Sequence, residues 1–131
     1  MISGDFMYTI ILKEEDMLKE NHFPVIALLN EAYNTDIIAF IKELNQGIGS
    51  GYNYTTCSFW EELDDYDKEN IAHYDGIMIE TEDGEELCLC MKEMLDYFML
   101  LQSKIAYVNS ELANKMAVLL DEYKTVYKDT L

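Results

Sequence analysis

Apolar residues recur at helical spacing in the first third of the chain. Pro24 is expected in the first turn of a helix, where a missing N–H leaves no hydrogen bond unmade. Asn34 or Thr35 is expected to end that helix and to cap the next one. A second apolar stripe runs over residues 37–44, and Gly47 is expected to stop it. The N-terminal part of the chain is therefore predicted to be mainly helical.

The last third of the chain carries two longer apolar stripes of the same period. They cover residues 91–108 and residues 112–127. Asn109 or Ser110 lies between them and is expected to end the first helix and cap the second. Two C-terminal helices are predicted.

The middle of the chain predicts a small antiparallel sheet. Residues 52–59 are rich in aromatic and β-branched residues and predict one strand. Residues 76–90 predict a hairpin, because Asp83-Gly84 between two apolar segments is typical of a two-residue hairpin loop.

A two-residue loop also predicts the register of that hairpin. It places Ile79 opposite Cys88 and Ile77 opposite Cys90, on one apolar face. The two thiols are then expected to be small buried groups that face the C-terminal helices.

Three shorter segments complete the pattern. Residues 6–12 predict a buried strand, residues 13–20 are charged and helix-prone, and residues 61–70 have room for one helical turn. Helices, then a small antiparallel sheet, then helices define an α+β fold. A length of 131 residues without a linker predicts a single domain over residues 1–131.

The charge of the chain restricts its partners. It has 26 acidic residues and only nine basic ones, all of them Lys, for a net charge of −17. Without Arg and with this sign, binding to nucleic acid or to an anionic membrane surface is not expected. The N-terminus lacks the basic segment of a secretory signal, and the three Cys are an odd number, so a cytoplasmic protein with reduced thiols is predicted.

Much of that charge is concentrated in residues 57–86, which hold twelve acidic residues against one Lys, about −11 of the total of −17. Aromatic residues lie among them. Carboxylates pair with Lys and Arg, and rings supply contact area, so this segment is a candidate surface for a basic protein. A solvated acidic loop is the alternative for such a charge run. The candidate partner-binding residues are Trp60, Glu61, Glu62, Asp64, Asp65, Tyr66, Asp67, Glu80, Glu82, Asp83, Glu85 and Glu86.

No sequence motif for catalysis, phosphate binding or metal binding supports a function as strongly as this acidic segment does. The glycines of residues 47–51 lack the spacing and the following Lys of a phosphate-binding loop. Residues 65–76 have Asn70 and Gly76 where a calcium loop requires Gly and Glu. His22 and His73 have no adjacent nucleophile in a known arrangement. We therefore expect no catalytic residue, no cofactor, no metal site and no small-molecule substrate.

The order of these segments resembles the ribonuclease-toxin immunity proteins of bacterial contact-dependent growth inhibition. The resemblance covers about residues 24–125. It rests on the glycine-rich turn 47–51, on Cys57-Ser58-Phe59, on Tyr74-Asp75-Gly76-Ile77, and on the acidic and aromatic helix with Glu93, Tyr97 and Phe98. It implies a cytosolic, non-catalytic protein that binds a cognate toxin nuclease domain, in a 1:1 complex, and often covers its active site.

Two other functions use the same surface chemistry. An acidic adaptor or regulatory domain would bind a different basic protein. A nucleic-acid mimic would inhibit a DNA-binding protein by occupying its basic cleft. The sequence leaves both open beside the immunity function.

Overall fold

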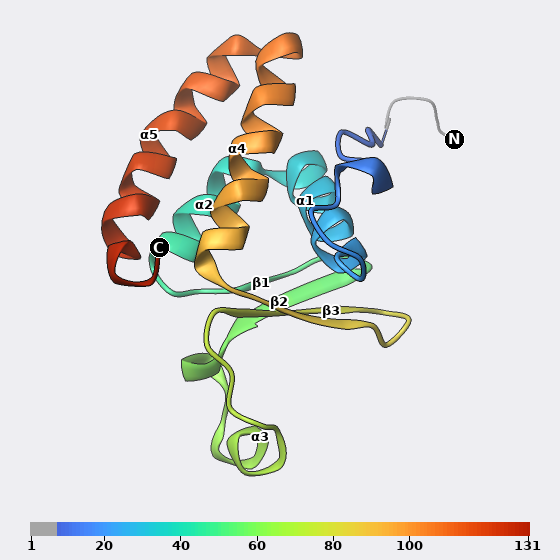
Figure 1. The fold of residues 1–131 in the computed structure, drawn as a ribbon, viewed down its shortest axis with the longest axis vertical. Helices are drawn as coiled ribbons and strands as arrows, with labels where there is room; N and C mark the ends of the chain where they lie inside the picture. The colour runs from blue at the N-terminus through green and yellow to red at the C-terminus, as the bar shows by residue number, and fades with distance from the viewer. Residues whose placement is uncertain (1–7) are drawn as a thin grey trace.

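The computed structural model describes residues 8–131 and places long helices before and after a four-stranded antiparallel sheet of order β1-β2-β3-β4 (Figure 1). The helices are α1 Phe23–Thr35, α2 Ile37–Asn45, α3 Asp65–Asn70, α4 Met91–Val108 and α5 Ser110–Val126. The strands are β1 Ser50–Gly51, β2 Thr55–Phe59, β3 Ile77–Thr81 and β4 Glu86–Leu89, and 3-10 turns lie at Glu14–Asp16, Trp60–Glu62 and Lys128–Thr130. This is the predicted α+β class.

The ends of α1 and α2 follow from local chemistry. Pro24 lies in the first turn of α1, as predicted. The helix ends at Thr35, and the Asp36 carboxylate then accepts the N–H of Ala39 at 3.0 Å and caps α2. After α2, Gly47 adopts a φ of +75°, which glycine tolerates without strain. The predicted end of α1 and the predicted stop at Gly47 are confirmed, but the residue that caps α2 is Asp36 and not Asn34 or Thr35 as predicted.

The hairpin of β3 and β4 has a longer loop than the sequence predicts. The N–H of Thr81 donates to the carbonyl of Glu85 at 2.9 Å, which leaves three residues in the loop. A two-residue Asp-Gly loop needs a positive φ at both residues, but here Gly84 has one, at +91°, and Asp83 does not. The predicted register is therefore wrong by one residue. The observed pairs are Ile77 with Leu89, Met78 with Cys88, Ile79 with Leu87 and Glu80 with Glu86.

This shift reverses the expected position of the thiols. Leu89 is buried opposite Ile77, whereas Cys88 and Cys90 are exposed. The prediction that the two cysteines face the helices is wrong, because side chains alternate between faces and a shift of one residue exchanges them. Cys57 on β2 is the buried cysteine.

One face of the sheet is covered by helices. Figure 1 shows α1, α2, α4 and α5 on the same side of the strands. The buried side chains of that face include Cys57, Ile77, Ile79 and Leu89, and they belong to the same apolar core as the helices. The Tyr123 hydroxyl donates to the carbonyl of Met91 at 2.7 Å and links α5 to the start of α4. The opposite face of the sheet, which we call the outer face, is not covered by these four helices.

Residues 8–12 do not form the predicted strand. Asn30 of α1 accepts the N–H groups of Ile11 and Leu12 at 3.0 and 2.9 Å and donates to the carbonyl of Leu12 at 2.9 Å. Asn34 makes equivalent bonds to Thr9 at 2.8 Å. Two side-chain amides thus satisfy the backbone in place of a neighbouring strand.

Of the other short segments, residues 61–70 match their prediction, whereas residues 13–20 and 52–59 match theirs only in part. The remaining part of the predicted strand, residues 6 and 7, lies outside the described residues. Residues 13–20 form only the 3-10 turn Glu14–Asp16, and of the predicted strand 52–59 only residues 55–59 pair as β2. The helical turn predicted within 61–70 is confirmed as α3.

Candidate partner-binding surface

The first half of the predicted surface lies on a segment that leaves the sheet after β2 and returns at β3. It comprises residues 60–76 and includes α3. Figure 1 shows α3 on the side of the sheet opposite the four long helices. Within the described residues, this segment is therefore not covered by the helical layer.

Two of the predicted acidic residues hold this segment in place. The Glu62 carboxylate accepts the N–H of Phe59 at 2.9 Å and the N–H of Gly49 at 3.0 Å. Only glycine fits at position 49, because a Cβ there would lie 2.0 Å from the carbonyl oxygen of Cys57. The Asp64 carboxylate accepts the N–H of Asp67 at 2.8 Å and caps α3. Glu62 and Asp64 thus have structural partners already.

The two predicted aromatic anchors differ in exposure. Trp60 is half-buried, with its ring centroid 4.8 Å from that of His73 and 5.6 Å from that of Tyr74. Tyr66, on α3, is 73% exposed. Trp60 therefore supports the segment from within, and Tyr66 is the ring that a partner can cover.

The second half of the predicted surface is the β3–β4 hairpin. All five of its predicted acidic residues are exposed, and the Asp83 carboxylate accepts the Tyr54 hydroxyl proton at 2.7 Å. Across residues 8–131, the predicted acidic set makes one ion pair, between Glu61 and Lys68 at 3.9 Å. Most of these carboxylates therefore have no cationic partner within the described chain, and their field is directed to solvent.

The outer face of the sheet brings the two halves together. Ser58, Met78, Glu80 and Glu86 point away from the helices, since they alternate with buried neighbours. Leu63, Ile71 and Tyr74 of the 60–76 segment lie against them and enclose a hollow of about 180 Å³. We call this the outer hollow.

The outer hollow divides the predicted residues into groups. Glu80 and Glu86 lie at the hollow beside the 60–76 segment, and Trp60 reaches it through its contact with Tyr74. Glu82, Asp83 and Glu85 belong to the hairpin loop and the first residue after it. Sequence reasoning missed the apolar part of this surface, Leu63, Ile71 and Met78. Strand alternation would have found Met78, but the approach of the other two depends on how the segment folds back.

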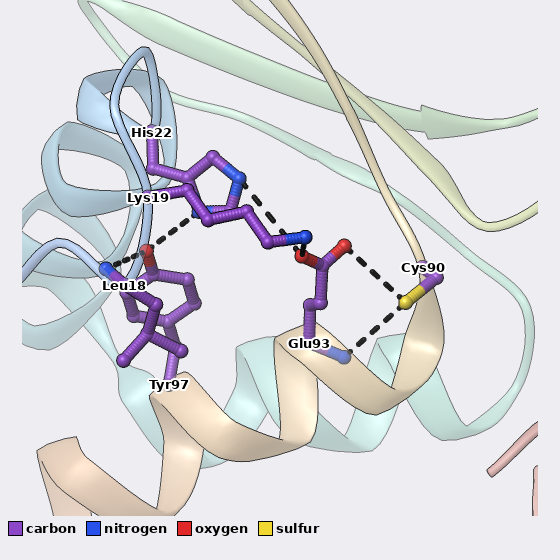
Figure 2. Close-up of polar contacts among 6 residues, drawn as sticks. All are labelled: Leu18, Lys19, His22, Cys90, Glu93 and Tyr97. Atoms are coloured by element: carbon purple, nitrogen blue, oxygen red, sulfur yellow. Dashed lines mark hydrogen bonds and ion pairs between the residues drawn. The ribbon is translucent and has the colours of Figure 1, made fainter.

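A second polar cluster lies on the helical side of the molecule, where α4 meets the turn before α1. Figure 2 shows that it joins Leu18, Lys19 and His22 to Cys90, Glu93 and Tyr97. The Tyr97 hydroxyl accepts the N–H of Leu18 at 2.8 Å and lies 2.7 Å from His22 Nδ1. Glu93 lies 2.9 Å from the Lys19 ammonium and 4.0 Å from His22 Nε2.

A neutral His22 satisfies these contacts with one arrangement of protons. Because the Tyr97 hydroxyl already accepts from Leu18, it can donate its single proton to His22 Nδ1. We infer that neutral His22 then carries its own proton on Nε2, which faces Glu93. Burial lowers the pKa of His22 and favours this neutral form, while Lys19 holds the pKa of Glu93 below its usual range. Burial also raises the pKa of Tyr97.

The cluster is suited to holding a turn rather than to proton transfer with a substrate. His22 is only 6% exposed, and both of its ring nitrogens face protein groups. Cys90 Sγ donates to Glu93 at 3.3 Å and accepts the N–H of Glu93 at 3.5 Å, so it caps α4. The cluster fixes residues 18–22 against α4.

The other thiols are poor nucleophiles. Burial raises the pKa of Cys57 to about 12, and burial together with Asp75 raises that of Cys88. Among residues 8–131 there is no group of three or more His, Cys, Asp or Glu side chains arranged to hold a metal ion. None of the described helices is long and apolar enough to cross a membrane.

Neither a search against protein-family models nor a search of curated proteins finds a match to this chain.

Proposed function

We propose that this chain is an immunity protein that binds and neutralises a basic ribonuclease toxin of a contact-dependent growth inhibition system. The observation that carries the proposal is a run of exposed carboxylates on the 60–76 segment and the outer face of the sheet, most of which have no cationic partner among residues 8–131. The 60–76 segment lies on the side of the sheet away from the helical layer, and it also carries the exposed ring of Tyr66. The order of sequence segments that resembles this family supports the same function.

The charge of this surface fits the chemistry of a nuclease. A ribonuclease binds a polyanion, so its cleft is basic, and a folded acidic surface can compete with RNA for that cleft. Opposite charges also speed association, up to about 10⁸ M⁻¹s⁻¹ at low salt. Residues such as Asp65 and Glu69 would act in this step, because their exposed carboxylates are available to a partner.

Slow release requires contact area as well as charge. Exposed aromatic side chains supply it at low entropic cost, and Tyr66 is placed on a short helix that Asp64 caps. Glu62 and Trp60 would act indirectly, by keeping the segment in its conformation.

We propose that the protein acts by binding, without catalysis, in the cytoplasm of the cell it protects. His22 is enclosed by protein groups, and the thiols of Cys57 and Cys88 stay protonated near neutral pH. These features support a binding protein over an enzyme.

The test is co-expression with the toxin domain encoded beside this chain, followed by growth, co-purification and association kinetics. Asp65→Asn with Glu69→Gln removes two charges from the proposed surface, and Asp121→Asn with Asp129→Asn removes two exposed charges from the C-terminal helical end as a matched control. We expect the first pair to slow association several-fold at low salt and the control to leave it unchanged. Tyr66→Ala is expected to speed dissociation about tenfold.

Each result bears on one part of the proposal. Equal effects of the two charge pairs would place the binding surface elsewhere. Binding to the toxin without protection from it, or capture of an unrelated basic protein, would favour an acidic adaptor or a nucleic-acid mimic. Turnover of RNA by this chain alone would contradict the proposal that it is not an enzyme.

A further inference from the structure

The outer hollow contains an arrangement that a solvated acidic loop does not need. Glu80 and Glu86 are directly opposite each other on neighbouring strands. Like charges in this position destabilise a sheet. Neither carboxylate makes a hydrogen bond or an ion pair with any of residues 8–131 (the described part of the chain), so the repulsion between them is not relieved there.

The remaining lining of the hollow is uncharged and consists of apolar side chains and two hydroxyl groups. Part of its wall is apolar and comes from Leu63, Ile71 and Met78. Deeper in, the Ser58 and Tyr74 hydroxyls lie 3.1 Å apart, and Tyr74 is only 8% exposed. An apolar wall with a pair of carboxylates beside it matches a long side chain that has an aliphatic stem and a cationic end.

The volume of the outer hollow limits the size of the group that can occupy it. The hollow measures about 180 Å³, whereas pockets for small-molecule ligands usually span about 300–1,000 Å³. There is room for one side chain. Two adjacent carboxylates supply enough acceptors for a guanidinium fork or for an ammonium group.

We propose that the outer hollow receives one Lys or Arg side chain of the basic partner, with the stem against Ile71 and Met78 and the charged end between Glu80 and Glu86. This inference rests on the proposed function for the identity of the partner. It adds that a specific anchor, and not only a diffuse field, holds the complex together. A basic side chain would also relieve the repulsion between the two carboxylates.

The first experiment uses capped amino acids as probes, because they do not depend on the toxin. N-acetyl-arginine amide and N-acetyl-lysine amide are titrated into the full chain, and methyl signals of Ile71 and Met78 are followed by NMR. We expect saturable shifts in the millimolar range with at least one of them and none with N-acetyl-citrulline amide, which has a similar shape without the charge. The stronger of the two responses identifies the preferred side chain.

Two double variants separate the hollow from the general charge. Glu80→Gln with Glu86→Gln removes both carboxylates of the hollow, and Glu82→Gln with Glu85→Gln removes the same charge from the hairpin loop next to it. The shifts should disappear in the first variant and persist in the second. The first variant should also melt at an equal or higher temperature, because a like-charge pair is removed, so a loss of binding cannot be attributed to unfolding.

The second experiment measures affinity for the toxin domain with the same variants. We expect at least a tenfold loss for the hollow variant and less than a threefold loss for the loop variant. Equal losses, or no saturable shift with either cationic probe, would overturn the anchor while leaving the proposed function in place. Specific shifts together with no toxin binding would contradict the proposed function and leave the cation-binding hollow standing.

Discussion

At the scale of single residues, several titratable groups have structural tasks that their charge alone does not reveal. His22 is the clearest case, because it is buried and neutral beside the Tyr97 hydroxyl in a chain where most ionisable groups are exposed. Its protonation would remove the acceptor that Tyr97 uses. Because protonation of His22 costs free energy in the folded state, His22 should make the stability of the protein depend on pH.

We expect His22 to make the protein less stable as the pH falls from about 7 to about 5. Its pKa in the unfolded chain is about 6.5, and burial lowers the pKa in the folded state. Below about pH 6.5 the unfolded state binds more protons, so the free energy of unfolding decreases until the folded-state pKa is reached. Urea unfolding across this range should give a steeper loss for the wild type than for His22→Gln.

His73→Gln is the matched control for this prediction, because the His73 side chain is 59% exposed. The free energy of unfolding of this variant should fall with pH as steeply as that of the wild type. General charge effects of a chain at −17 are shared by all three proteins and cancel in the comparison. An equally steep loss of stability with falling pH in His22→Gln would show that His22 is not its source.

The neighbouring glutamates 61 and 62 are expected to differ strongly in their effect on stability. Glu62→Ala loses the bonds to the N–H groups of Phe59 and Gly49 and should cost about 1.5–3 kcal/mol in the free energy of unfolding. Glu61→Ala loses a single long ion pair at an 88% exposed side chain and should stay within about 0.5 kcal/mol. Denaturant titration of both variants measures this difference, and equal losses would show that Glu62 does not hold the segment.

At the scale of elements, the hairpin decides which side chains face the core and which lie on the outer face. A three-residue loop with Gly84 at positive φ shifts the register by one residue and places Leu89 inside and Cys88 outside. The same shift sets Glu80 opposite Glu86 on the outer face. The proposed anchor site therefore depends on the length of one loop.

Thiol labelling tests this register directly. We expect the exposed Cys88 and Cys90 to react with a maleimide in the native protein, Cys88 more slowly because its pKa is raised, and Cys57 to react only after unfolding. The pKa of Cys57 is raised to about 12 by burial, which slows its reaction further. Peptide mass spectrometry identifies the labelled sites. A native protein that protects Cys88 and Cys90 would instead have the two-residue loop.

At the scale of the whole molecule, charge is separated from the apolar core by the sheet. The helices and the inner face of the sheet bury the apolar side chains, and the 60–76 segment and outer face carry much of the net charge. Unpaired like charges repel one another, so this surface is expected to lower the stability of the free protein, and under the proposed function the same charge attracts the basic partner.

Added NaCl should therefore act in opposite directions on the free protein and on its complex. Salt screens self-repulsion, so we expect the melting temperature of the free chain to rise between low salt and about 0.5 M, while association with the toxin slows. The variant that replaces Asp65, Glu69, Glu80 and Glu86 by their amides should respond less in both measurements. A melting temperature that falls with NaCl would show that the acidic residues are neutralised within the fold.

The helices could be predicted from the sequence because their signals are local. Periodic apolar residues, Pro24 in the first turn and Gly47 after α2 report on neighbours within one helical turn. The acidic segment was visible for the same reason, since charge density can be counted along the chain. The division of its carboxylates into structural and free ones was not, because Glu62 bonds to Gly49, which lies 13 positions away.

The sequence by itself determined the α+β order of elements, the excess of negative charge and the absence of Arg, all of which are properties of composition and short-range pattern. Only the tertiary structure decided that Cys88 faces outward, that Trp60 is half-buried and Tyr66 is exposed, and that Leu63 and Ile71 meet Glu80 and Glu86 at one hollow. Those outcomes depend on loop conformation and on contacts between distant segments. Many chain arrangements share the same local pattern, and the packing of the whole fold selects one of them.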